Sequence, residues 1–200
     1  MNDKELFQML GQSLNCEPAA LKAVAEVESG GKSGFLASGR PQILFEGHVF
    51  YKYLKEFQTE AFALKTSTNF PDLCYKSWSK NFYKGGEKEW ERLEAARSID
   101  QIAANMATSW GIGQIMGFNY KLCGCSGVNE MVDRMCKSQE EQITLWMTFL
   151  KNSPNCLKPL QAKNWAGFAK AYNGSGYAQN KYDTRLKAAY DKWVKAGYNS

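Results

Sequence analysis

The sequence predicts a mostly α-helical protein folded as a single globular domain over residues 1–200. Apolar residues recur at helical spacing along nearly the whole chain, and almost no segment alternates apolar and polar residues for long. Prolines, N-cap residues and glycines mark the ends of these segments. The composition is also ordinary for a globular protein, since 44% of the 200 residues are hydrophobic and 22% are charged. A chain of this length can form one core without metals or crosslinks.

The N-terminal third begins with two predicted helices. The first spans about residues 5–14 and carries Leu6, Met9, Leu10 and Leu14 on one face. The second begins at Pro18, a residue suited to the first helical position, and ends at Gly30–Gly31, where a left-handed cap costs little. Glycine and serine then predict a loop or a small β-hairpin near residues 33–45.

Helices also account for most of the remaining chain. We expect one from Glu46 to Phe57, whereas residues 58–86 show no clear pattern. Two short pieces bounded by glycines lie between Trp110 and Leu122. The other predicted helices span 87–97, 98–108 with Ser98 as N-cap, 138–151, 164–172 and about 183–196.

Several classes of protein are disfavoured by the sequence. The longest strictly hydrophobic run is four residues (61–64), far below the ~20 that a membrane-spanning helix needs. The N-terminus lacks the basic start and apolar stretch of a secretory signal, so we expect the protein to remain in the cytoplasm where it is made. The six cysteines include only one close pair, Cys123 and Cys125, and the only histidine is His48. We therefore expect free thiols and no metal site.

Positive charge is concentrated in the last quarter of the chain. Residues 151–200 hold nine basic side chains against two acidic ones, a net charge of +7. Such a surface attracts polyanions, including nucleic acid, acidic lipid and anionic cell wall, although a simple solvated lysine surface is also typical. No zinc-finger spacing or RNA-binding aromatic motif accompanies the lysines, which disfavours nucleic acid as the partner.

Glu28 is the residue whose position is most informative. In the predicted helix from Pro18 it lies three, four and seven residues after Ala25, Val24 and Leu21, and so falls on the apolar face. Glu26 lies about 200° away, on the polar face. Burial and the negative end of the helix dipole should both raise the pKa of Glu28, which suits a general acid. A buried structural glutamate is an equally good reading of helix position alone.

Two further segments combine small, polar and aromatic residues. Ser109–Gly117 places a hydroxyl, the amide of Gln114 and two glycines among apolar residues, and its glycines allow close approach of a ligand. Tyr172–Gly174 joins an aromatic ring to the amide of Asn173, a combination able to stack on a sugar and bond its polar groups. Either segment alone could be ordinary structure.

Taken in order, these segments resemble the phage N-acetylmuramidase endolysin family of the lysozyme superfamily, which also contains goose-type lysozymes and soluble lytic transglycosylases. Glu28–Gly31 is similar to the motif that carries the catalytic acid, Ser109–Met116 to the second motif and Tyr172–Gly174 to the third. Gly39–Phe50 resembles the segment that distinguishes phage muramidases. The resemblance spans roughly residues 17–195.

The resemblance implies a lysozyme-like catalytic domain with a cleft, without a cofactor, that hydrolyses the β-1,4 bond between N-acetylmuramic acid and N-acetylglucosamine in bacterial peptidoglycan. Glu28 would be the general acid and Glu46 the second catalytic carboxylate, activating water or stabilising charge. Goose-type relatives favour inversion through a bound water. His48, two residues after Glu46 on a helix, would point elsewhere and make a structural hydrogen bond, while Arg40 would stabilise the loop.

Substrate binding would fall to Ser109, Gln114, Tyr172 and Asn173. Many endolysins carry a separate wall-binding domain, and we expect none in this chain, so the basic last quarter would supply wall affinity. We expect a monomer that does not insert into membranes. It would reach the wall from the host cytoplasm after a separate membrane-permeabilising protein releases it.

Two alternatives remain open. In a lytic transglycosylase, Glu28 would serve as acid and then base, the sugar's own 6-hydroxyl would attack, and no second carboxylate would be needed. A noncatalytic wall-binding or virion protein could keep the same fold. Glu46 argues against the first alternative, and an acid on the apolar face of its helix argues against the second.

Overall fold

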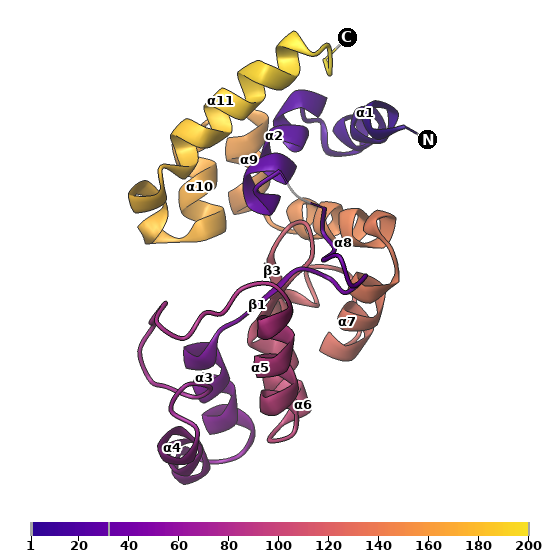
Figure 1. Cartoon of the computed structure of the whole chain (residues 1–200). Coiled ribbons are helices and arrows are strands. Elements are labelled where there is room, and N and C mark those ends of the chain that lie inside the picture. Colours follow the sequence, from indigo (N-terminus) through magenta and orange to yellow (C-terminus); the bar gives the residue numbers. More distant parts are fainter. Residues whose placement is uncertain (1, 32, 200) are drawn as a thin grey trace. The chain divides into compact units, whose positions relative to one another are not determined.

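The computed structural model describes residues 2–31 and 33–199, which form a predominantly helical structure with one small antiparallel sheet (Figure 1). The predicted fold class is confirmed. The chain divides into two compact units, Met1–Lys32 with Trp146–Ser200 and Ser33–Leu145, and the boundary falls inside α8 (Gln139–Lys151). In the described part of the chain, no helix is both long enough and apolar enough to span a membrane.

The first unit is built of helices. These are α1 (Asp3–Leu14), α2 (Pro18–Ser29), the end of α8, α9 (Pro154–Gln161), α10 (Trp165–Asn173), the 3-10 helix η2 (Ser175–Asn180) and α11 (Tyr182–Lys195). Helix α2 packs against both α11 and α1 (Figure 1). Its many small buried side chains allow both neighbours to approach closely. The core beside it includes Phe7, Leu21, Trp146, Phe168 and Leu186.

Helix α2 has the ends that the sequence predicts. Pro18 occupies the first turn, and Gly30 adopts a left-handed conformation with φ 62°. The Gly30 N–H closes the last turn on carbonyls of Glu26 and Val27. Because a β-carbon is disfavoured at this φ, glycine fixes the point where the chain leaves the helix, two residues after Glu28.

The second unit combines the sheet with five helices and a short 3-10 helix. The strands are β1 (Ile43–Phe45), β2 (Thr108–Trp110) and β3 (Ile115–Met116), in the order β1-β2-β3. The helices are α3 (Gly47–Phe57), α4 (Glu60–Asn69), α5 (Glu87–Arg97), α6 (Gln101–Met106), η1 (Gly117–Asn119) and α7 (Val128–Lys137). The largest buried side chains include Phe45, Phe50, Leu93, Trp110 and Met131.

The predicted hairpin near residues 33–45 is present only as a single bridge between Phe35 and Pro41. Strand β1 instead pairs with β2, so that Ile43 lies opposite Trp110 and Phe45 opposite Thr108. Strand β3 continues the sheet on the other side of β2. The β element therefore exists, but the partner strand of β1 comes from far along the chain.

Other differences concern helix boundaries. The predicted helix 98–108 begins at Gln101, because the Asp100 side chain accepts the Ala103 N–H as the N-cap, while Ser98 ends α5. Helix α3 begins at Gly47 instead of Glu46. Helices α4, α7 and α9 were not among the predicted elements. The remaining predicted helices agree with α1, α2, α5, α8, α10 and α11 to within about two residues.

A fully buried carboxylate, that of Glu89 on α5, organises the second unit. Its Oε1 accepts the backbone N–H groups of Lys84 and Gly85, at 2.5 and 3.1 Å. Its Oε2 accepts the Phe45 N–H at 3.2 Å and Arg92 Nη1 at 2.8 Å. Four donors thus converge on one carboxylate, and they come from three separate segments.

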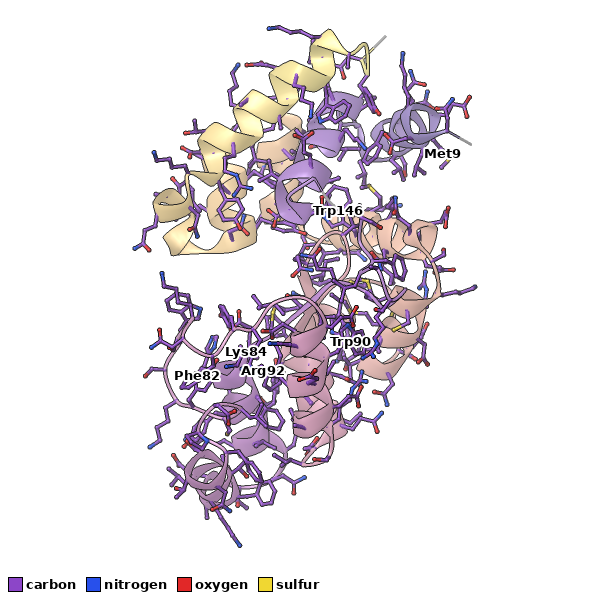
Figure 2. All side chains as sticks on the ribbon, viewed as in Figure 1. Met9, Phe82, Lys84, Trp90, Arg92 and Trp146 are labelled. Atoms are coloured by element: carbon purple, nitrogen blue, oxygen red, sulfur yellow. The ribbon has the colours of Figure 1, made fainter. Side chains whose placement is uncertain are left out.

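Arg92 completes this network one turn later on α5. Its guanidinium donates to the carbonyl oxygens of Phe45, at 3.1 Å, and of Asp72, at 3.0 Å, in addition to Glu89. Figure 2 labels Arg92 and Lys84, which both donate to the Glu89 carboxylate, Lys84 through its backbone N–H. A buried charge is tolerated only when it is paired and hydrogen-bonded, and the two side chains satisfy each other in this way.

A second buried polar side chain, Gln142 of α8, connects the segments on either side of the sheet. It accepts the Ile112 N–H at 2.9 Å and donates to the carbonyls of Gly34 and Met135, at 3.2 and 2.9 Å. A β-carbon at Gly34 would lie 1.9 Å from Gln142 Oε1, and one at Gly111 would lie 2.7 Å away. Glycine at both positions therefore makes room for the amide.

All six cysteines are free, and only Cys136 is exposed. Burial raises the pKa of Cys16 to about 11 and that of Cys123 to about 12, so both thiols stay protonated at neutral pH.

Replacing Glu89 with Gln should destabilise the protein strongly. The substitution leaves Arg92 buried without its counter-ion, a loss of about 3–5 kcal/mol in the free energy of unfolding. Denaturant unfolding checks this, with Asp191→Asn as the control, since the exposed Lys187–Asp191 pair should contribute less than about 1 kcal/mol. Equal losses in the two variants would show that the Glu89 network is not a structural anchor.

Candidate active site

Glu28 lies in the last turn of α2, partly buried, as its helical phase predicts. Asn173 Nδ2, at the end of α10, donates to Glu28 Oε1 at 3.3 Å. Burial raises the pKa of Glu28 to about 7, although the bond from Asn173 and the positive charge of Arg185 act in the opposite direction. A substantial fraction of this carboxyl group is therefore protonated at neutral pH.

Glu26 is in a different environment from Glu28. Its carboxylate pairs with Lys192 of α11 at 2.9 Å, while Lys22 pairs with Asp3 at the same distance. The expected solvated acid is thus partly exposed, as its helix position predicts, but it is ion-paired with a neighbouring helix. The ion pair with Lys192 therefore distinguishes the surroundings of Glu26 from those of Glu28, which accepts a hydrogen bond from the amide of Asn173.

The third motif supplies one contact to Glu28 and one aromatic cluster. Asn173 is the residue that contacts the acid. Tyr172 is half-buried and packs against Phe149 and Phe168, with ring centroids 5.8 and 5.2 Å apart. Its hydroxyl accepts the indole N–H of Trp146 at 3.0 Å. Tyr172 therefore has a defined place in the core of the first unit, and its contact with a sugar stays a prediction.

The second motif brings Ser109 and Gln114 together in the second unit. Ser109 Oγ donates to Gln114 Oε1 at 3.0 Å, and Gln114 Nε2 donates to the carbonyls of Gly111 and Gln42, at 2.8 and 3.2 Å. These bonds connect the β2–β3 turn with the segment before β1. Both side chains thus hold this turn in shape, and their predicted role in substrate binding stays a prediction.

Glu46 lies between β1 and α3, with 15% of its side chain exposed. The hydroxyl of Tyr83 donates to Glu46 Oε2 at 2.6 Å, and His48 Nδ1 lies 3.4 Å from the same oxygen. Burial, and then the hydrogen bond with Glu46, raise the pKa of Tyr83 well above its usual range, so the tyrosine remains a donor.

The prediction that His48 points away from Glu46 is wrong. Glu46 is the extended N-cap of α3, with φ −106° and ψ 94°, so the two residues are not related by helical phase. In the described residues, Nδ1 of His48 is buried without a hydrogen bond of good geometry, and its ring stacks on Tyr75 at 6.4 Å. Within the described residues, Nδ1 therefore does not form the structural hydrogen bond expected for His48.

Tyr83 was not among the predicted site residues, since it lies in the stretch 58–86, which shows no clear pattern in the sequence. Arg40 contacts the ring of Trp90 at 5.5 Å and Glu87 at 3.8 Å, consistent with the expected role in the loop. Among residues 2–31 and 33–199, no three His, Cys, Asp or Glu side chains gather in a way that could hold a metal ion.

The predicted site residues fall into two groups, one in each unit. Glu28, Tyr172 and Asn173 belong to the first, and Glu46, Ser109 and Gln114 to the second. The first group offers a carboxyl group with a raised pKa beside an amide. The second offers a carboxylate held by a tyrosine, next to a strand whose turn is fixed by a serine–glutamine pair.

Comparisons with known proteins identify the family of this chain. The family model described as N-acetylmuramidase matches residues 17–194. The crystal structure of a Burkholderia AP3 phage endolysin is 37% identical and superposes with a TM-score of 0.85, covering 96% of this chain and 71% of that one. No curated protein matches. On the extent of the family match and the similarity to this endolysin, the chain belongs to the phage N-acetylmuramidase endolysin family.

Proposed function

We propose that this peptidoglycan-degrading muramidase hydrolyses the β-1,4 bond from N-acetylmuramic acid to N-acetylglucosamine, with Glu28 as general acid. The observation that carries the proposal is the raised pKa of Glu28, about 7, at the end of an otherwise apolar helix. Protonation of the glycosidic oxygen requires a neutral carboxylic acid near the working pH.

The contact with Asn173 supports a defined place for that proton. The amide N–H donates to Oε1 of Glu28, so this oxygen acts as an acceptor. The proton would then reside on the other oxygen, Oε2. Asn173 would thereby orient the carboxyl group of Glu28 without removing its proton.

Glu46 is the proposed second carboxylate. Its Oε2 is held by Tyr83, and a nearly buried carboxylate of this kind can activate a water molecule or stabilise the positive charge of an oxocarbenium-like transition state. A lytic transglycosylase needs no such group, because its substrate supplies the attacking hydroxyl. The second carboxylate therefore favours hydrolysis, and we expect inversion at the anomeric carbon.

Wall affinity is proposed to come from the basic last quarter of the chain. Ion pairs engage Lys163, Lys187 and Lys192. In the described part of the chain, five exposed lysines of this region have no acidic partner, namely Lys151, Lys158, Lys170, Lys181 and Lys195. We further propose that the enzyme acts on the wall from the host cytoplasm, after another protein has permeabilised the membrane.

Glu28→Gln should abolish cleavage of purified peptidoglycan. The amide preserves volume and accepts the Asn173 bond but cannot donate a proton, and general acid catalysis typically contributes ~10²–10⁴ in rate. Turbidity loss measures the rate, and circular dichroism confirms the fold. Glu26→Gln is the matched control and should stay within about twofold of the unaltered protein, since its surface ion pair is worth little. A folded Glu28→Gln variant with near-normal activity would rule out the assignment.

The raised pKa of Glu28 also predicts how pH affects rate and stability. Activity should fall as pH rises through about 7, because the acid ionises. The folded state binds this proton more tightly than the unfolded chain, whose glutamate titrates near 4.5, so the stabilisation is complete below 4.5 and lost as pH rises through 7.

Glu28→Gln should therefore make the folded protein more stable than the parent at pH 8, by about 1–2 kcal/mol once partial exposure of the side chain is allowed for. No comparable gain is expected at pH 4. Thermal unfolding at both pH values measures the difference. The same change in Tm at pH 4 and pH 8 would contradict the raised pKa.

The reaction product separates hydrolysis from transglycosylation. Hydrolysis should leave muramic acid with a free reducing end, and Glu46→Gln should reduce the rate severely while the fold is kept. Transglycosylation would give a 1,6-anhydro sugar, lighter by one water, and would depend on Glu46 only through structure. Mass spectrometry of the muropeptides distinguishes the two. Mainly anhydro products would exclude the hydrolase mechanism.

A further inference from the structure

The contact between Tyr83 and Glu46 has the length of a strong hydrogen bond. Tyr83 Oη lies 2.6 Å from Glu46 Oε2, within the range typical of a hydroxyl that donates to a carboxylate. His48 Nδ1 is on the same oxygen at 3.4 Å. Within the described residues both contacts use Oε2, so Oε1 is the oxygen left to receive a proton from water.

Both residues of this pair are anchored on the same buried group. Glu89 accepts the N–H of Phe45, the residue before Glu46. It also accepts the N–H of Lys84, the residue after Tyr83. The backbone on each side of the hydrogen bond is therefore fixed to one carboxylate, which Arg92 neutralises.

This anchoring matters because Tyr83 lies outside any helix or strand. The segment before α5 ends in Gly85 and Gly86, both with positive φ, and such a loop would otherwise leave the tyrosine ring free to move. Phe82 packs on Tyr75 with centroids 4.9 Å apart, which adds a second attachment (Figure 2 labels Phe82).

We propose that Tyr83 is a positioning residue, held by Glu89, that fixes Oε2 of Glu46 and so aims Oε1 at the attacking water. The inference rests on the proposed role of Glu46 in water delivery. Tyr83 contacts neither the acid nor the scissile bond in this scheme, and its whole effect passes through Glu46. If Tyr83 only held the loop in place, its replacement would change the stability of the protein and leave kcat unchanged.

The test is a double-mutant cycle with Tyr83→Phe, Glu46→Gln and the two combined, assayed on soluble uncrosslinked peptidoglycan strands. Tyr83→Phe should lower kcat by about 10- to 100-fold, as expected for loss of one bond to a charged group, and leave KM within about twofold. In the Glu46→Gln background, the same change should have no further effect on the residual rate.

Tyr51→Phe is the matched control. Its hydroxyl is buried and has no hydrogen-bond partner in the described residues, so removing it should leave kcat unchanged. Thermal unfolding of each variant checks that Tyr83→Phe remains folded at the assay temperature, since loss of a hydrogen bond to a charged group should lower the Tm by several degrees without unfolding the protein.

Four results would overturn the inference. Equal losses in both backgrounds would mean that Tyr83 acts independently of Glu46, and a rise in KM with normal kcat would mean that it binds substrate. If Tyr83→Phe kept near-normal activity while Glu46→Gln was inactive, the proposed role of Tyr83 would be wrong and the proposed function would stand. Full activity of Glu46→Gln would instead remove the proposed role of Glu46, and this inference with it.

Discussion

The second unit depends on a single buried charge. Glu89 has no access to solvent, and its carboxylate receives donors from the strand before Glu46, from the loop after Tyr83 and from Arg92. Such a group is costly to bury, and it is retained only if every oxygen is satisfied. Because three of the four donors are backbone N–H groups, the network specifies the path of the chain and depends on only one other side chain, that of Arg92.

In the first unit, burial raises the pKa of a carboxyl group, that of Glu28. Helix α2 presents small side chains to its neighbours, and Glu28 occupies the same apolar surface at the helix end. Burial then favours the protonated form, while Asn173 orients the group. The two units thus place their carboxyl groups in different environments, since burial favours the protonated form of Glu28 and the hydroxyl of Tyr83 donates to Glu46.

Local sequence patterns predicted helix ends and helical phase, which depend on neighbouring residues. They did not predict strand pairing, which depends on contacts between distant segments. Pro18 and Gly30 bounded α2, and periodicity placed Glu28 correctly. Strand β1 was expected to pair within its own loop, yet its partner is β2, because pairing is decided by burial and hydrogen bonds across the fold. His48 was misplaced because an N-cap is extended and breaks helical phase, and Tyr83 had no periodic signal at all. The assigned roles of the site residues stay predictions.

The side chain of Gln142 couples two positions that are far apart in the sequence, 34 and 142. It occupies the volume that a side chain at residue 34 would need, and its nitrogen bonds the carbonyl of that same residue, 108 positions away. A shorter residue at 142 would remove the closest contact to a β-carbon at 34, with Ile112 Cβ still 3.0 Å away. It would leave the carbonyl of Gly34 and the Ile112 N–H unbonded. In related sequences, Gly34 and Gln142 should therefore covary, so that the two residues are conserved together or replaced together.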